Sequence, residues 1–154
     1  MEYFDNDFFG EPFFHENTKF PPIGQHVDSY IINSNLVSEP SNFSFLYLCT
    51  DSNDNKEKVI KFIKYYEKNE EYIANEISTM KIAKHPNVIS LENYFRYDAF
   101  AYLVLPYTKR RSLLWHMIKF YRNGMPNNVA CAIFKQMLTA VAYIHQLGIW
   151  HRDI

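Results

Sequence analysis

Cysteine and long apolar runs are both scarce in this chain. Its 154 residues contain two cysteines, Cys49 and Cys131, with neither a C-x-x-C pair nor another spacing typical of metal ligands. Two isolated thiols favour a reducing compartment over a disulfide framework. No apolar run approaches the roughly 18–20 residues that a membrane span needs, and residues 1–20 lack the features of a secretory signal. We therefore expect a cytoplasmic or nuclear protein without a membrane partner.

An excess of charge of either sign is also missing. Sixteen basic and 17 acidic side chains leave a formal net charge of −1, so composition predicts no nucleic-acid partner. The short basic run at residues 109–111 is expected to lie in a solvated loop. Hydrophobic residues make up 47% of the chain, which is enough to form the core of one ordinary domain.

Phenylalanine is concentrated at the start of the chain. Residues 1–20 hold six phenylalanines, mixed with Asp, Glu and Asn, and show neither helical nor strand periodicity. Two interpretations remain open. We favour an extended tail whose aromatic side chains bind the domain's own surface, because aromatics commonly serve burial. The alternative is a segment that binds a partner protein.

The middle of the chain predicts a sheet with one inserted helix. Segments rich in aromatic and β-branched residues predict five strands. These strands cover residues 29–32, 43–49, 58–65, 88–94 and 101–105. Ile73, Ile77 and Met80 have helical spacing and predict a helix over residues 70–84, after the third strand. Pro86 ends it, because proline disfavours the helical conformation in the residue before it.

The last third predicts helices. Residues 112–121 form one expected helix, and residues 127–147 form a longer one with apolar side chains at three- and four-residue steps. Gly148 stands where a left-handed helix cap is expected. The order of elements indicates an α+β fold in which the last helices begin a second, helical layer.

Four motifs, in order, resemble those of protein kinases. Residues 140–154 (AVAYIHQLGIWHRDI) resemble the junction between a long helix and the catalytic loop with its H-R-D signature. Residues 75–91 resemble the helix that carries an ion-pair glutamate and the His-Pro-Asn turn after it. Residues 58–61 (KVIK) resemble the V-A-I-K strand, and residues 102–107 (YLVLPY) resemble the strand that leads to the hinge.

The resemblance implies three regions. Residues 1–28 are a Phe-rich extension, and residues 29–107 are a kinase-like N-lobe with a five-stranded antiparallel sheet and one helix. Residues 108–154 are the first helices of an incomplete C-lobe. The implied activity is ATP-dependent phosphoryl transfer to a protein substrate, with Mg²⁺ as the metal ion.

Lys61 and Glu76 are implied to bind the nucleotide together. In the family a strand lysine holds the α- and β-phosphates and a helix glutamate holds the lysine. Lys61 lies among apolar strand residues, where an unpaired ammonium is costly. Lys64 remains a less favoured alternative. Val59 is expected over the adenine, where the family usually has alanine.

Further nucleotide contacts are implied at the phosphate loop and the hinge. Leu36 begins the segment that matches the phosphate loop, and Leu105 takes the gatekeeper position. Pro106 is expected to offer a backbone carbonyl to the adenine, since proline retains that group, and Thr108 a backbone N–H. These residues complete the predicted cofactor-binding set.

Asp153 and Arg152 are the implied catalytic residues. Asp153 falls in the position of the aspartate that accepts the proton of the substrate hydroxyl, and Arg152 is expected to order the catalytic loop. The family's magnesium ligands fall after Ile154, so we assign no metal ligand to this chain. We therefore expect an incomplete domain that is inactive by itself.

The phosphate loop departs from the family pattern. Kinases place G-x-G-x-x-G over the phosphates because glycine permits close backbone approach. Residues 36–47 contain no glycine, and the four glycines of the chain all lie elsewhere. A serine/threonine kinase is the favoured reading. The alternatives are a pseudokinase-like binding module with weak or no ATP binding, and an unrelated α+β interaction domain.

Overall fold

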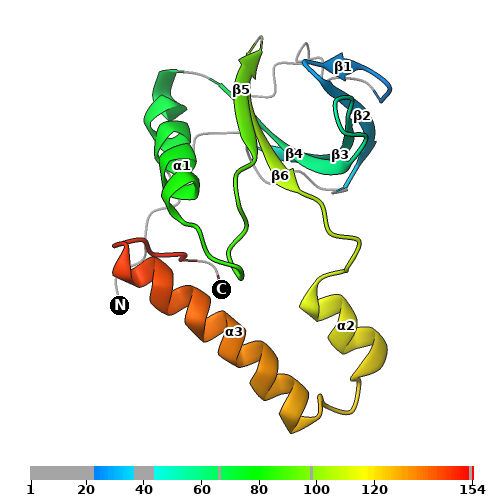
Figure 1. The fold of residues 1–154 in the computed structure, drawn as a ribbon, viewed down its shortest axis with the longest axis vertical. Helices are drawn as coiled ribbons and strands as arrows, with labels where there is room; N and C mark the ends of the chain where they lie inside the picture. Colours follow the sequence, from blue (N-terminus) through cyan, green and yellow to red (C-terminus); the bar gives the residue numbers. More distant parts are fainter. Residues whose placement is uncertain (1–22, 37–43, 66, 98, 153) are drawn as a thin grey trace, which may run out of the picture.

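A six-stranded antiparallel sheet and three α-helices make up the described structure (Figure 1). The computed structural model describes residues 23–36, 44–65, 67–97, 99–152 and 154. The strands are β1 (His26–Val27), β2 (Tyr30–Asn35), β3 (Ser44–Asp51), β4 (Glu57–Lys64), β5 (Asn93–Tyr97) and β6 (Phe100–Pro106). The helices are the short 3-10 helix η2 (Glu67–Asn69), α1 (Glu70–Ile82), α2 (Leu113–Phe120) and α3 (Asn127–Gln146).

The sheet curls around an aromatic core. Its strand order is β1-β2-β3-β4-β6-β5, yet Tyr30 on β2 stacks on Phe95 of β5 with ring centroids 5.9 Å apart. The amide of Asn93 also donates to the hydroxyl of Tyr30 at 3.2 Å. Phe62 lies inside the curl, fully buried, with edge contacts to Tyr47 and Tyr102. Non-neighbouring strands are therefore brought together by this core.

A second core cluster attaches α1 to the sheet. Ile73 on the helix is buried with Ile63, Ala101 and Leu103 from β4 and β6. Ile77 and Met80 follow at helical spacing and pack on the same cluster, as the sequence pattern predicted. The helix ends two residues before the predicted boundary, and the backbone N–H of Ala83 caps it by donating to Thr79.

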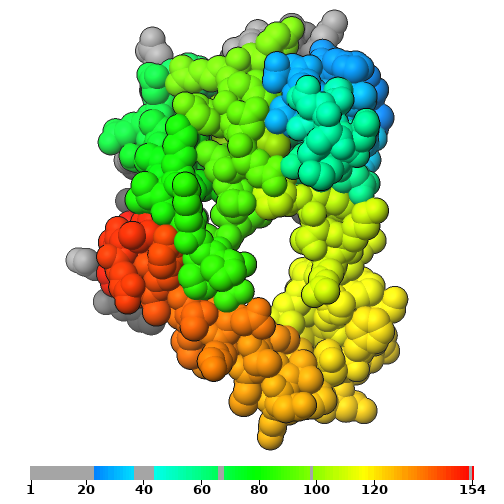
Figure 2. Space-filling model, viewed as in Figure 1, coloured from blue at the N-terminus to red at the C-terminus, as the bar shows by residue number. Residues whose placement is uncertain are grey.

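The long C-terminal helix α3 contacts the segment that follows α1. The Tyr143 hydroxyl on α3 accepts from the Lys84 backbone N–H and donates to the Ile82 carbonyl. The ring of Tyr143 stacks on His85 at 5.1 Å. Figure 2 shows an opening between the sheet region and α2 and α3. Among the described residues, no helix has both the length and the apolar character of a membrane span.

The expected sheet is present, with two corrections. The two-residue strand β1 adds a sixth strand ahead of the predicted boundary at residue 29. The strand predicted over residues 88–94 starts too early and ends too soon, because β5 begins at Asn93 and runs to Tyr97. The Val88 N–H instead closes a turn on the His85 carbonyl, and Leu91 packs against the core under α1. Apolar side chains in a loop, of which Leu91 packs on the core, therefore imitated the start of a strand.

Candidate functional site

One face of the sheet gathers most of the side chains that were predicted to bind a nucleotide. Two residues that are paired across neighbouring antiparallel strands have their side chains on the same face of the sheet. The strand register therefore defines rows of neighbouring side chains. One row runs across β3, β4 and β6 through Leu46, Lys61 and Leu103. Leu36, the residue after β2, extends this row, because its backbone N–H donates to the Leu46 carbonyl. A second row holds Leu48, Val59 and Leu105. The predicted residues Leu36, Val59, Lys61 and Leu105 therefore share this face.

An ion pair joins this face to α1. Glu76 is three residues after the buried Ile73, at the edge of the helix stripe that packs on the sheet. Its Oε1 lies 2.6 Å from Nζ of Lys61, and the two side chains are 20% and 23% exposed. The pair is thus partly shielded from water, where a charge–charge hydrogen bond is stronger than on the open surface.

The alternative lysine lies on the other face of the sheet. Side chains alternate along a strand, so Lys64, three residues after Lys61, points away from Glu76. The pairing that was predicted between Lys61 and Glu76 is thereby present in the structure. Their role in binding a nucleotide stays a prediction.

The second oxygen of Glu76 has an unused hydrogen-bonding capacity. Oε2 is buried and has no hydrogen-bond partner among the described residues. A buried acceptor without a donor costs roughly 1–3 kcal/mol. The Glu76 carboxylate can therefore accept one more hydrogen bond beside the ion pair.

Two further ion pairs lie at the end of β4 beside the predicted hinge. Lys58 stands opposite Pro106 in the sheet and forms a salt bridge with Glu92. The hydrogen bond that Lys58 donates to the Glu92 carboxylate raises the pKa of Lys58. The next residue back, Glu57, lies 3.1 Å from the ammonium of Lys109. Neither ion pair could be predicted from the sequence, because no local sequence pattern connects residues that lie so far apart in the chain.

The hinge residues end the last strand of the sheet. Leu105 is buried, Pro106 is the final residue of β6, and Thr108 is exposed in the loop that follows. The Thr108 hydroxyl accepts from the Arg110 backbone N–H at 3.3 Å, which forms a tight turn. Leu105 stands directly opposite Val59, so the gatekeeper candidate and the adenine-pocket candidate are neighbours.

The predicted catalytic residues are only partly described. Asp153 lies outside the described residues, as do residues 37–43 of the glycine-free loop. Arg152 is exposed and adopts a positive φ of 66°, which is uncommon for a residue with a side chain. No contact joins Arg152 to Lys61 or Glu76 among the described residues.

Three apolar residues of the site escaped the sequence prediction. Leu46, Leu48 and Leu103 occupy the same face as Lys61 and Val59. Leu46 and Leu48 could have been found from the alternation of side chains along β3. Because Tyr47 and Cys49 are buried on one face of the strand, the leucines between them point to the other face. This face has an apolar floor and one paired cation, which suits a flat heterocycle with attached phosphates.

Magnesium ligands are not found at this site. Among the residues that the structure describes, no group of three His, Cys, Asp or Glu side chains could hold a metal ion. No ligand of Mg²⁺ is therefore assigned among the described residues.

Known proteins resemble this chain over most of its length. It is 37% identical over 82 residues to the yeast "Serine/threonine-protein kinase GIN4" from Saccharomyces cerevisiae, covering 53% of this chain and 7% of that protein. It is 37% identical over 99 residues to "CBL-interacting protein kinase 32" from Oryza sativa, covering 64% of this chain and 21% of that protein. The chain thus spans about a fifth or less of these relatives.

A solved structure has the same fold. The chain described as "Crystal structure of Rad53 1-466 in complex with AMP-PNP" matches with a TM-score of 0.71 at 21% identity, over 82% of this chain and 33% of that chain. The family model described as "Protein kinase domain" matches residues 41–154, which is most of the sequence. With its N-lobe fold and its lysine–glutamate pair, the chain belongs to the protein kinase domain family.

Proposed function

We propose that this chain carries the nucleotide-binding part of a serine/threonine protein kinase, which transfers a phosphoryl group from ATP to a protein hydroxyl. The observation that carries the proposal is the 2.6 Å ion pair between Lys61 and Glu76 on an otherwise apolar sheet face. The serine/threonine preference rests on the names of relatives such as the yeast kinase. Because the chain covers only part of those relatives, the activity of the whole protein is part of the proposal.

Each residue of the site has a distinct task in binding. The ammonium of Lys61 would contact the α- and β-phosphates, while Glu76 keeps that ammonium in place. Leu36, Val59 and Leu105 would enclose the adenine. Beyond them, the Pro106 carbonyl and the Thr108 N–H would form hydrogen bonds to its edge. Apolar contacts and a few fixed polar groups are the usual basis of specificity in such pockets.

Asp153 and Arg152 would serve the chemical step. Asp153 would accept the proton of the substrate hydroxyl, and Arg152 would order the loop that carries it. ATP with Mg²⁺ supplies the transferable phosphoryl group and the neutralisation of its charge. The substrate would be a Ser or Thr side chain of another protein in the cytoplasm.

A second candidate is a pseudokinase-like binding module. The observation that favours it is the absence of glycine from residues 36–47. Side chains in a phosphate loop keep its backbone away from the phosphates, and Glu39 would add a negative charge close to them. In that case the fold would serve to bind protein partners.

Binding of MgATP to the 154-residue chain tests both candidates. Isothermal titration should detect binding, and Lys61→Met should weaken it about 10- to 100-fold, since a hydrogen bond to a charged group is worth roughly 1.5–3 kcal/mol. The matched control is Lys64→Met, on the opposite face of the same strand, which should bind like the parent chain.

Two results would contradict the kinase proposal in different ways. Equal affinities of the Lys61→Met and parent chains would remove Lys61 from the site. No binding by the parent chain, with its fold confirmed by circular dichroism, would favour the binding module.

A further inference from the structure

A shielded ion pair crosses the end of β6, where the predicted hinge begins. Nζ of Lys58 on β4 donates to Oε2 of Glu92, the residue just before β5, and β6 lies between these two strands in the sheet. The two side chains are 14% and 33% exposed. Of the other ion pairs between described residues, only that of Lys61 and Glu76 is comparably shielded. Exposed pairs contribute little, whereas a shielded pair can hold two strands in place.

The pair lies on the face of the sheet opposite to the predicted adenine pocket. Side chains alternate along β4, so Lys58 points away from its neighbour Val59. Lys58 shares a row with Cys49 on one side and Pro106 on the other. Proline has no backbone N–H and cannot donate to β4, so a side-chain tie at this level adds a constraint that the backbone of Pro106 lacks. Lys58 can therefore act on the pocket only through the position of the strand end.

Both partners are themselves held by the sheet. The carbonyl of Lys58 accepts a hydrogen bond from Sγ of Cys49 at 3.5 Å, which adds to the pairing of β3 with β4. The backbone N–H of Glu92 donates to the Val104 carbonyl on β6 at 2.9 Å. The ion pair therefore joins two fixed points across β6.

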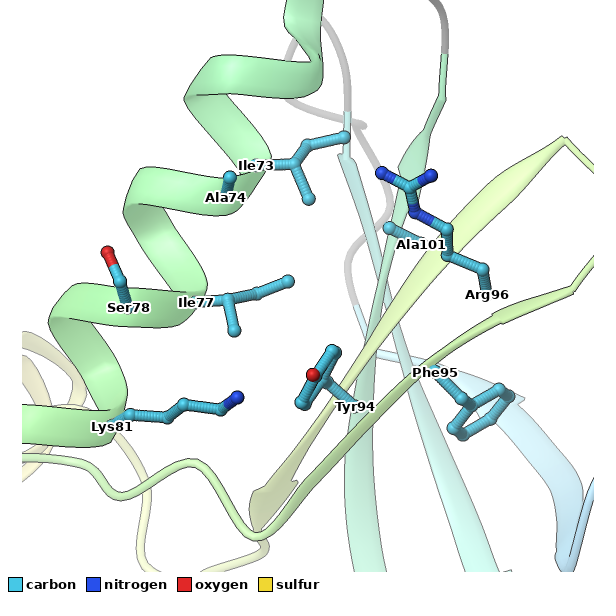
Figure 3. Close-up of a pocket in the computed structure, with 9 residues that line it drawn as sticks. All are labelled: Ile73, Ala74, Ile77, Ser78, Lys81, Tyr94, Phe95, Arg96 and Ala101. Carbon is cyan, nitrogen blue, oxygen red and sulfur yellow. The ribbon is translucent and has the colours of Figure 1, made fainter.

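The segment that carries Glu92 is also attached to α1. Tyr94 follows Glu92 by two residues, and the ammonium of Lys81 on α1 lies 4.1 Å from the centre of its ring. Figure 3 shows these two side chains together at one end of a pocket of about 400 Å³ between α1 and β5. The same helix carries Glu76, so one framework supports both the phosphate-binding lysine and the hinge.

We propose that Lys58 and Glu92 are positioning residues for the adenine of the bound nucleotide, an inference that rests on the proposed function. Their ion pair fixes the end of β6, and with it the Pro106 carbonyl and the Thr108 N–H that would bind the edge of the base. Hydrogen bonds weaken steeply when their distance and angle depart from the optimum. A small displacement of the hinge backbone therefore lowers the affinity for the base, although neither charged side chain touches it.

Hydrogen exchange of the free 154-residue chain tests the positioning without a nucleotide. Lys58→Met and Glu92→Gln should each speed amide exchange about tenfold in the peptide covering residues 103–110, because the strand end opens more often. Residues 70–82 of α1 should exchange as in the parent chain. Lys56→Met, which removes an exposed lysine from the turn before β4, is the matched control and should change neither segment. Unchanged exchange at the hinge, or equally faster exchange in both segments, would overturn the proposal.

Titration with MgATP tests the consequence for binding. Lys58→Met and Glu92→Gln should each weaken binding about threefold to tenfold, which is the effect of losing one neutral hydrogen bond. Lys58→Arg keeps the charge and should bind within about twofold of the parent chain. If the two charges acted only through their field on the anionic nucleotide, Glu92→Gln would strengthen binding instead.

The outcomes separate this inference from the proposed function. Unchanged affinity in both variants, or opposite effects of Lys58→Met and Glu92→Gln, would overturn the positioning role alone, provided that Lys61→Met still weakens binding. Absence of MgATP binding by the parent chain would overturn both.

Discussion

The sheet region and the helical region of this chain differ in how they bury apolar side chains. Among the described residues, every buried hydrophobic side chain except Ile144 comes from residues 27–105. Many large apolar side chains of α2 and α3 are instead exposed, including Leu114, Ile118, Phe134 and Leu138. The sheet region thus has its own core, whereas the helices have an amphipathic pattern without a core beneath it.

The difference shows that periodicity and packing are separate properties. The α3 helix forms where its pattern predicts, although its exposed side gains little burial. Its position depends on a few polar contacts, such as those from Tyr143 to Ile82 and Lys84 and from Asn87 to Thr139. Exposed apolar surface of this kind marks an interaction face. Substitutions of apolar side chains in the two regions should therefore change the stability by very different amounts.

The largest expected difference concerns two phenylalanines. Phe62→Ala should lower the free energy of unfolding by about 3–5 kcal/mol, because Phe62 is fully buried and its removal leaves a cavity. Phe134→Ala should change it by less than about 0.5 kcal/mol, since Phe134 is 59% exposed. Urea denaturation of the two variants measures both values. Similar losses in both would mean that α3 is packed in solution.

The second largest difference is expected in the reactivity of the two cysteine thiols. Burial raises the pKa of the Cys49 thiol to about 12, while Cys131 is exposed on α3. Only the thiolate form of a cysteine reacts with a disulfide reagent. At pH 8 the exposed Cys131 should therefore react rapidly, whereas Cys49 should react only after unfolding. As the pH rises to 9, Cys49 should stay protonated and slow. The control is Cys131→Ser, which should have no rapidly reacting thiol.

Polar substitution on α3 should then reduce self-association. Phe134 and Leu138 are one turn apart and both more than half exposed, so Phe134→Gln with Leu138→Gln removes a continuous apolar patch. We expect weaker binding of a hydrophobic dye and less association in analytical ultracentrifugation, at an unchanged melting temperature. Ile89→Gln, an exposed residue of the sheet region, is the control and should have little effect. A lower melting temperature in the α3 variant would contradict this expectation.

The smallest effect is expected from a surface ion pair. Hydrogen bonds from Tyr65 and Arg96 hold the pKa of Glu70 below its ordinary value of 4.5. The ionised carboxylate therefore stabilises the fold at neutral pH, and this contribution is lost as the pH falls below 4.5 through the lower folded pKa. Glu70→Gln should lower the melting temperature slightly at pH 7 and not at pH 3. A difference that persists at pH 3 would point to packing instead.

Much of the site could be predicted from sequence, with clear physical limits. Lys61 and Glu76 were predicted as a pair from family motifs, and the structure places them 2.6 Å apart. Leu46, Leu48 and Leu103 were missed, although their alternation along the strands marked them. The partners Lys58 and Glu92 could not be predicted, since 34 residues separate them and only strand pairing brings them together.

By itself, the sequence determined the type and order of the elements and the motifs of the kinase family. Helical and strand periodicities are local, so α1, α3 and most strands could be predicted from them. Only the tertiary structure decided the curl that stacks Tyr30 on Phe95, the loop that replaced the start of the predicted fourth strand, and the pocket behind α1. These features depend on contacts between residues distant in the chain, which no local pattern encodes.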